Sequence, residues 1–155
     1  VPVVQVAGGY LWESNTICRF LAGEAGRADL LPVQPLARAR VEMWMDWQAT
    51  ELNSSWRYAF MALVRKSAVF ADPDAIAGSV AGWNRQMGIL DGQLAKTGAY
   101  VAGPDFTLAD IVLGLSTNRW KMTPMERQHL PAVEDWWARL LDRPGFREFA
   151  ANGVP

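Results

Sequence analysis

The 155-residue chain is long enough for one sizeable hydrophobic core, or for one domain and part of another, and half of its residues are apolar. Its 15 Lys and Arg residues are balanced by 16 Asp and Glu residues, so a formal net charge of -1 offers no basic surface for nucleic acid. A single cysteine and a single histidine exclude an internal disulfide and a structural zinc site, and no apolar run approaches the roughly twenty residues that cross a membrane. These features predict a cytoplasmic chain without a metal and without a nucleic-acid or membrane partner.

The first predicted element is a β-hairpin. Val3 to Val6 is a β-branched run, Ala7-Gly8-Gly9 has the composition of a turn, and Tyr10 to Trp12 resumes an aromatic-rich strand. An isolated two-stranded hairpin is marginally stable in water. We therefore expect these strands to need further sheet or a covering helix.

A short helix is predicted after the hairpin. Ser14 is typical of a helix N-cap, and an apolar stripe follows it at Ile17, Phe20 and Leu21. The segment Gly23 to Pro35 is rich in glycine and proline, which indicates a linker between two differently patterned regions.

From Leu36 onward the pattern is helical, and a long helix is predicted from Leu36 to Arg65. Apolar side chains recur on two of its faces, as in a helix that is wedged between neighbours or lines a partner or a ligand. One face consists of Val41, Trp44, Met45, Gln48, Leu52, Trp56, Ala59, Phe60 and Leu63. The other consists of Met43, Trp47, Thr50, Ser54, Tyr58 and Met61.

The next helix is predicted to begin at Asp72-Pro73-Asp74, because proline is favoured in a first helical turn, and to end at Gly98. The segment Phe106 to Ile111 contains a Thr-x-x-Asp capping box, with its two end residues placed as a hydrophobic staple. Two further helices, divided by Pro144, are predicted from Leu130 to Leu141 and from Gly145 to Ala151.

Four segments, in this order, carry a family pattern: Val1-Pro2-Val3-Val4, Glu13-Ser14-x-x-Ile17-x-x-Phe20-Leu21, Phe106-Thr107-Leu108-Ala109-Asp110-Ile111 and Trp137-Ala138-Arg139-Leu140-x-x-Arg143-Pro144-x-Phe146. Together they resemble a cytosolic glutathione transferase, and Ala49-Thr50-Glu51-Leu52 is similar to the bacterial beta class. The resemblance implies a mainly α fold. Residues 1-25 would be the β-β-α second half of a thioredoxin-like, glutathione-binding α/β domain, residues 26-35 a linker, and residues 36-155 an all-helical C-terminal domain.

The resemblance also implies a glutathione site. In it, the backbone of Val1 pairs with the cysteinyl part of glutathione, Pro2 is a cis-proline, and Glu13 and Ser14 hold the γ-glutamyl end. Ser14 suits this role on physical grounds as well, since orphan N–H groups and the dipole at a helix N-terminus favour an anion. Asp46 would reach across a homodimer toward the ammonium group of the partner's glutathione, or would be a solvated carboxylate on a helix face.

A second-substrate pocket is expected on the long helices, because an apolar electrophile needs a concave aromatic wall. Asn53 stands where the beta class usually has a histidine, which is a departure from that class. The other candidates are Trp56, Tyr58, Asn118 and Trp120, with the alternative that they are core residues, since an aromatic stripe on a helix is more often core. Asp110 is explained by the capping box, Cys18 is expected to pack as a small hydrophobe, and His129 is expected at the surface.

The implied activity is conjugation of the glutathione thiol to a hydrophobic electrophile in detoxification, or a related dehalogenase, isomerase or peroxidase reaction. The family's sulfur-activating residue lies in or just after a first strand, so a β-α-β unit of about 30 residues or more is expected upstream of Val1. We expect an N-terminally incomplete enzyme whose catalytic residue is unknown and whose 155 residues alone have negligible activity; a true truncated product is the alternative. The rival function is a noncatalytic dimerisation or binding module with the same fold.

Overall fold

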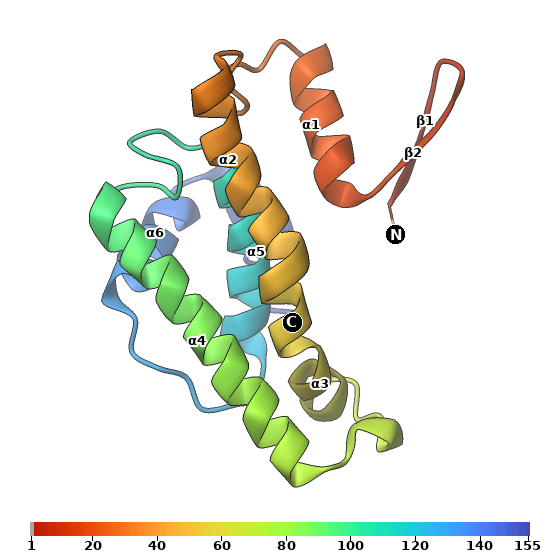
Figure 1. Cartoon of the computed structure of the whole chain (residues 1–155), viewed down its shortest axis with the longest axis vertical. Helices are drawn as coiled ribbons and strands as arrows, with labels where there is room; N and C mark the ends of the chain where they lie inside the picture. Colours follow the sequence, from red (N-terminus) through yellow and green to blue (C-terminus); the bar gives the residue numbers. More distant parts are fainter. Residues whose placement is uncertain (1) are drawn as a thin grey trace.

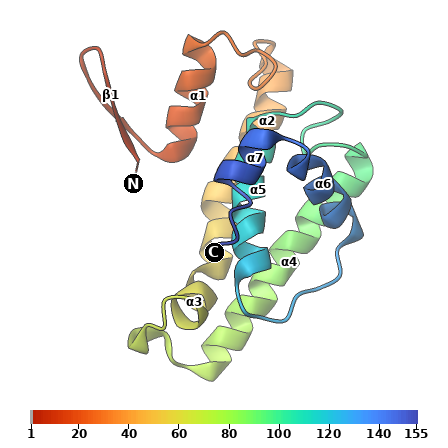
Figure 2. The ribbon, with the colours of Figure 1, turned by 180° about the vertical axis from the view of Figure 1, so that it is seen from behind.

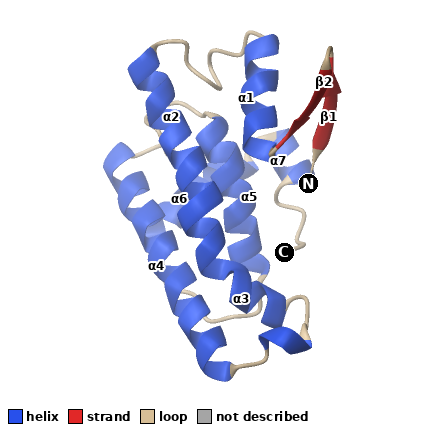
Figure 3. Ribbon diagram, turned by 45° about the vertical axis from the view of Figure 1, so that its right-hand side comes forward, coloured by secondary structure: helices blue, strands red, loops and turns tan. Residues whose placement is uncertain are grey.

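A β-hairpin and one helix lie at the side of a bundle of helices in the computed structural model, which describes residues 2–155 (Figure 1). The strands β1 (Val3–Val6) and β2 (Gly9–Trp12) form the predicted hairpin, and they pair antiparallel with Val3 opposite Trp12. Figure 3 shows both strands next to α1 (Ser14–Glu24) and away from α4 (Pro73–Thr97). The remaining elements are α2 (Pro35–Trp47), the π-helix η1 (Gln48–Leu52), α3 (Asn53–Leu63), the 3₁₀-helix η2 (Ala68–Phe70), α5 (Leu108–Met122), α6 (Pro131–Leu141) and α7 (Pro144–Phe149). This order confirms the predicted fold, a β-β-α segment followed by an all-helical region.

Helix α1 begins one residue away from the predicted position. Ser14 is its first helical residue and Glu13 is its N-cap, with φ 68° and ψ 113°, so the prediction of Ser14 as the N-cap was wrong. The cause is the short connection, since β2 ends at Trp12 and a single residue has to turn the chain into the helix. A positive φ at this residue makes that turn.

The long helix predicted from Leu36 to Arg65 is interrupted, which corrects the prediction. A π-helical turn from Gln48 to Leu52 separates α2 from α3, and α3 ends at Leu63. Hydroxyl groups bond back to the helix at this point, Thr50 Oγ1 to the Asp46 carbonyl at 2.9 Å and Ser54 Oγ to the Thr50 carbonyl at 2.6 Å. Such bonds compete with the helical ladder.

Helix α4 has the predicted ends. The Asp72 carboxylate accepts a hydrogen bond from the Asp74 N–H at 2.9 Å, and Gly98 closes the helix in the left-handed conformation with φ 74°. Helix α3 packs on α4, α4 on α6, and α2 on α5.

Helix α5 lies at the centre of the bundle (Figure 1). Most of its residues are buried. Its capping box between Thr107 and Asp110 forms as predicted. Seen from behind, α7 lies against α5 (Figure 2), where the Phe146 ring packs on Gly114. The largest fully buried side chains include Trp83, Trp120 and Trp136. Nowhere in residues 2–155 is a helix both long and apolar enough to span a membrane.

Candidate functional site

Ser14 lies where three pockets meet. The first, the hairpin pocket, is lined by Pro2, Trp12, Glu13 and Ser14. The second, the Asp46 pocket, is lined by Glu13, Ser14, Asn15, Thr16, Arg19, Asp46, Gln48, Ala49 and Asn53. The third, the Arg119 pocket, has a volume of about 470 Å³ and is lined by Ser14, Asn15, Cys18, Gln48, Asn53, Ile111, Val112, Leu115, Ser116, Asn118, Arg119, Ala150, Asn152, Val154 and Pro155. A ligand at Ser14 therefore has access to the hairpin, to α2 and to the centre of the bundle.

The N-terminus of α1 forms the wall that these pockets share. Among the described residues, no side chain caps this end of α1, so the N–H groups of its first turn have no side-chain acceptor. The helix dipole adds positive potential at the same place. Glu13, the N-cap, is held at a positive φ that side-chain-bearing residues rarely adopt, and strain of this kind concentrates at functional sites.

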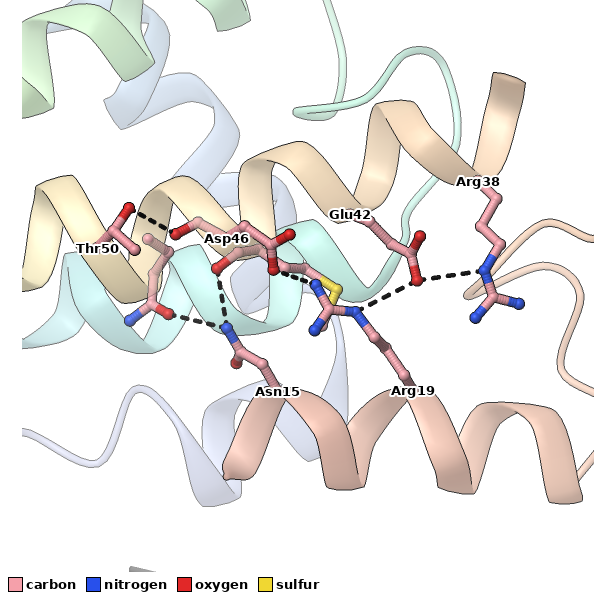
Figure 4. Close-up of polar contacts among 8 residues, drawn as sticks. Asn15, Arg19, Arg38, Glu42, Asp46 and Thr50 are labelled. Atoms are coloured by element: carbon pink, nitrogen blue, oxygen red, sulfur yellow. Dashed lines mark hydrogen bonds and ion pairs between the residues drawn. The ribbon is translucent and has the colours of Figure 1, made fainter. Parts of the chain in front are cut away.

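Asp46 lies beside this helix end and is tied to it by Arg19 (Figure 4). Arg19 Nη2 of α1 donates to Asp46 Oδ1 of α2, and Arg19 Nε lies 3.3 Å from Glu42 Oε1. Glu42 also pairs with Arg38, at 3.2 Å. The Asp46 side chain remains 66% exposed, so one ion pair does not close it to a ligand. Its action across a dimer stays a prediction.

Gln48 links α1, α3 and α5 by hydrogen bonds. Asn15 Nδ2 donates to the Met45 carbonyl at 2.9 Å and to Gln48 Oε1 at 3.3 Å, and Gln48 Nε2 donates to Asn53 Oδ1 at 3.2 Å and to Ser116 Oγ at 2.9 Å. The sequence prediction placed Gln48 in an apolar stripe and missed this role. The only signal for it was a polar residue in that stripe, since the π-turn that begins at Gln48 has no clear sequence pattern.

Asn53 and Trp56 form one unit. Trp56 Nε1 donates to Asn53 Oδ1 at 3.0 Å, and the Trp56 ring packs edge-on against Phe60 with centroids 5.3 Å apart. Asn53 lines both the Asp46 pocket and the Arg119 pocket. Trp56 itself is not among the residues that line the Arg119 pocket, and it contacts that pocket through Arg119, whose guanidinium carbon lies 4.5 Å from the Trp56 ring centroid.

The structure brings Asn118 into the site and leaves Tyr58 and Trp120 away from it. Asn118 lines the Arg119 pocket, and its Nδ2 donates to the Val154 carbonyl of the C-terminal segment at 2.8 Å. Trp120 is 1% exposed and donates from Nε1 to Asn84 Oδ1 at 3.0 Å, which makes it a core residue. Tyr58 packs edge-on against Phe70 with centroids 5.0 Å apart, so its ring belongs to the contact between α3 and η2.

Pro2 and Val1 were predicted to contact the cysteinyl part of glutathione. Pro2 lines the hairpin pocket, whereas Val1 and the Val1–Pro2 bond lie outside the described residues.

Two further titratable side chains, Cys18 and His129, lie in different surroundings. Cys18 lines the Arg119 pocket, and burial raises the pKa of its thiol, with Arg19 acting in the opposite direction. His129 is exposed. In the part of the chain that the structure describes, no three His, Cys, Asp or Glu side chains are grouped closely enough to hold a metal ion.

We compared the chain with known protein families, curated proteins and solved structures, and the results agree with a β-β-α segment beside a helical bundle. Residues 57–144, more than half of the chain, match the family model of the glutathione S-transferase C-terminal domain. The chain belongs to the glutathione S-transferase family.

Particular relatives support this assignment. The chain is 32% identical to the glutathione S-transferase GstB of Escherichia coli over 89% of its length, and it spans 66% of that protein. It is similar to the theta class glutathione S-transferase of Xanthomonas axonopodis pv. citri, with 34% identity, a TM-score of 0.88 for the apo form, and coverage of 97% of this chain and 78% of the other. The same bacterial protein is known with glutathione bound. Elongation factor 1-gamma 2 of rice is 27% identical over 96% of this chain, which spans 35% of that protein.

Proposed function

We propose that this protein is a glutathione transferase that holds glutathione at Ser14 and conjugates its thiol to a second substrate in the Arg119 pocket. The observation that carries the proposal is the uncapped N-terminus of α1 at the junction of three pockets, within residues 2–155. The relative from Xanthomonas axonopodis, whose structure is known with glutathione bound, supports it.

Each part of glutathione has a partner in this proposal. Ser14 and the first-turn N–H groups of α1 bind the γ-glutamyl carboxylate, because a helix N-terminus favours an anion. Glu13 binds the γ-glutamyl end beside Ser14, and Asp46 reaches across the proposed dimer to supply a negative charge for the ammonium group of the partner's glutathione. The hairpin pocket at Pro2 receives the cysteinyl backbone, and the sulfur is directed toward the Arg119 pocket. None of these residues is assigned the activation of the sulfur.

The proposal includes a homodimer and a cytoplasmic location. Exposed apolar side chains on α2 and α4, Leu36, Met43 and Ile89, favour an interface through these two helices. Asp46 lies three residues after Met43 on α2, so such an interface would bring Asp46 toward the partner. The cytoplasmic location rests on the single cysteine and the absence of a possible internal disulfide.

The subclass is a finer part of the proposal. Ala49 to Leu52 favours a beta-class-like enzyme, whereas Asn53 departs from that class and the 34% identical relative from Xanthomonas axonopodis belongs to the theta class. We therefore propose a bacterial-type enzyme near both classes.

A noncatalytic binding module is the second candidate, and a specific observation favours it. Elongation factor 1-gamma of rice is similar over 96% of this chain. The two functions differ in whether glutathione binds at all.

Calorimetric titration of the full-length protein with glutathione tests the proposal. We expect binding in the wild type and a loss of affinity of about tenfold or more in Ser14→Ala, since hydrogen bonds to charged groups contribute about 1.5–3 kcal/mol. Thr97→Ala, which removes a hydroxyl at the far end of α4, is the control and should bind normally. Absence of binding in the wild type would favour the module, and unchanged binding in Ser14→Ala would place glutathione elsewhere.

A further inference from the structure

Arg119 is a positively charged side chain in the pocket wall that has no counter-charge. Its guanidinium carbon lies 4.5 Å from the Trp56 ring centroid and 5.4 Å from that of Phe60. Within residues 2–155 the guanidinium is in no ion pair, and its buried Nε has no hydrogen-bond partner. By contrast, Arg19, Arg27 and Arg38 each pair with a carboxylate.

The energetics of this arrangement favour an anion. Taking a guanidinium out of water is costly unless a carboxylate or a similar group compensates for the loss. Burial lowers the pKa of Arg119, and the positive charge of Arg65 acts in the same direction. Arg65 itself lies 5.5 Å from the Phe60 ring centroid, so two guanidinium groups are close to one aromatic ring. Arg119 is therefore a positively charged group in the pocket wall, and no acidic side chain is among the described lining residues.

The lining of the Arg119 pocket differs from the aromatic wall that the sequence predicted. Arg119 lies over the face of Trp56, and polar side chains line much of the remaining wall, among them Gln48, Asn53 and Asn118. Several of these amides are already hydrogen-bonded to other protein groups, Gln48 to Ser116 and Asn118 to Val154. Arg119 is the one charged side chain of this wall, and its Nε has no hydrogen-bond partner within residues 2–155.

We propose that the second substrate carries an anionic group, a carboxylate or a group of similar shape, that binds to Arg119. This inference rests on the proposed function, because Ser14 lies in the wall of the same pocket and the reacting carbon would face the glutathione sulfur. A planar guanidinium offers two parallel N–H donors to a carboxylate, which fixes orientation as well as charge. The substrate class is thus a carboxylated electrophile with an apolar body.

Arg119 could instead have a purely structural role and hold α5 against α3 through Trp56. Three variants distinguish this role from the binding of an anionic substrate. Arg119→Met keeps an unbranched apolar chain on the Trp56 ring and removes the charge, so packing is largely retained. Arg119→Lys keeps the charge and loses the planar pair of donors. Arg57→Met on α3 is the control, since Arg57 is an exposed arginine outside the pocket.

Two matched electrophiles test the proposal in the full-length protein, 4-(chloromethyl)benzoate and its neutral analogue 4-methylbenzyl chloride. In Arg119→Met we expect kcat/KM for the carboxylate to fall about tenfold or more, with the neutral analogue and the affinity for glutathione within about twofold of wild type. Arg119→Lys should be intermediate, and Arg57→Met should behave as wild type. An equal fall for both electrophiles, or an unchanged preference, would overturn the proposal.

A binding measurement separates this inference from the proposed function. Calorimetry should detect 4-methylbenzoate binding to the wild type more tightly than 4-methylbenzamide, and the preference should disappear in Arg119→Met. If glutathione fails to bind while this preference is present, the transferase function fails and the anion site stands. If glutathione binds and the preference is absent, the anion site is refuted.

Discussion

At the scale of single residues, Asp110 links three parts of the helical bundle. Its oxygens accept hydrogen bonds from the Val101 N–H at 2.9 Å, the Thr107 N–H at 2.9 Å, Thr107 Oγ1 at 3.1 Å and Trp136 Nε1 at 2.9 Å. One fully buried side chain thus ties the loop after α4 and the start of α5 to α6.

Asp110→Asn should lower the free energy of unfolding by about 2–4 kcal/mol, because an amide nitrogen cannot accept the bonds that one carboxylate oxygen now accepts. Urea unfolding followed by circular dichroism measures the change. The exposed Asp74→Asn on α4 is the control and should remain within about 0.5 kcal/mol of wild type. A comparable loss in both variants would show that burial of Asp110 does not matter.

The stability difference between the wild type and Asp110→Asn should depend on pH. Burial raises the pKa of Asp110 above the ordinary 3.8, although its hydrogen bonds act in the opposite direction. The folded protein therefore takes up this proton at a higher pH than the unfolded chain does. Its contribution to stability is complete below 3.8 and is lost as the pH rises through the raised value. The stability difference between wild type and Asp110→Asn should grow as the pH falls through this range, and a difference that shrinks would mean a lowered pKa.

Glu13 combines an unfavourable backbone conformation with a place in the site. Since glycine adopts a positive φ without a steric penalty, Glu13→Gly should be more stable than Glu13→Ala by about 1 kcal/mol, while both bind glutathione more weakly than wild type. Thermal unfolding and glutathione titration measure the two effects separately. Equal stability of the two variants would argue that the turn is not strained.

At the scale of elements, close packing of α7 on α5 depends on Gly114. A Cβ built on Gly114 would overlap Phe146 Cε2, and it would lie 2.9 Å from Phe146 Cζ and 3.1 Å from Leu140 Cδ1. The two helices therefore approach one another only because this position on α5 has no side chain.

Gly114→Ala should destabilise the protein by about 1–3 kcal/mol through overpacking. Gly92→Ala on α4 is the matched control, because nothing lies within 4 Å of its Cβ position and alanine is the better helix former by up to about 1 kcal/mol. Chemical unfolding should give opposite signs for the two substitutions. The same sign for both would contradict the described packing.

The elements were predictable wherever local chemistry determines them. The capping box at Thr107, the Asp72 N-cap and the Gly98 end of α4 are local patterns, and all three formed as predicted. The π-turn at Gln48 was missed because an apolar stripe indicates a helix without indicating a wider turn within it. The position of the α1 cap was missed because the short link from β2 outweighs the preference of serine for the N-cap.

At the scale of the whole molecule, the candidate site is assembled from residues far apart in sequence. Ser14, Asn53 and Asn118 were predicted from the sequence, and all three line one pocket. Arg119, next to Asn118, lines the same pocket but was not predicted from the sequence. Trp120 and Tyr58 share the aromatic character of a pocket wall, yet they are held by Asn84 and Phe70 away from it. Residue type indicates a candidate, and only packing decides which side of α5 or α3 it occupies.

The proposed dimer also belongs to this scale. Met43 on α2 is 54% exposed, so Met43→Asp should place a charge in the interface and shift the protein toward the monomer. Val69→Asp is the control, since Val69 is 83% exposed in η2, outside α2 and α4, and should leave the assembly unchanged. Sedimentation velocity measures both. A wild-type monomer would remove the basis for Asp46 acting across an interface.

The most direct measurement is a crystal structure of the full-length protein with S-hexylglutathione. The γ-glutamyl carboxylate should lie at Ser14 and the first turn of α1, with the hexyl chain directed into the pocket bounded by Asn118 and Arg119. Occupation of the separate apolar pocket bounded by Phe106, Arg143 and Phe146, with the N-terminus of α1 left empty, would contradict the proposed glutathione site.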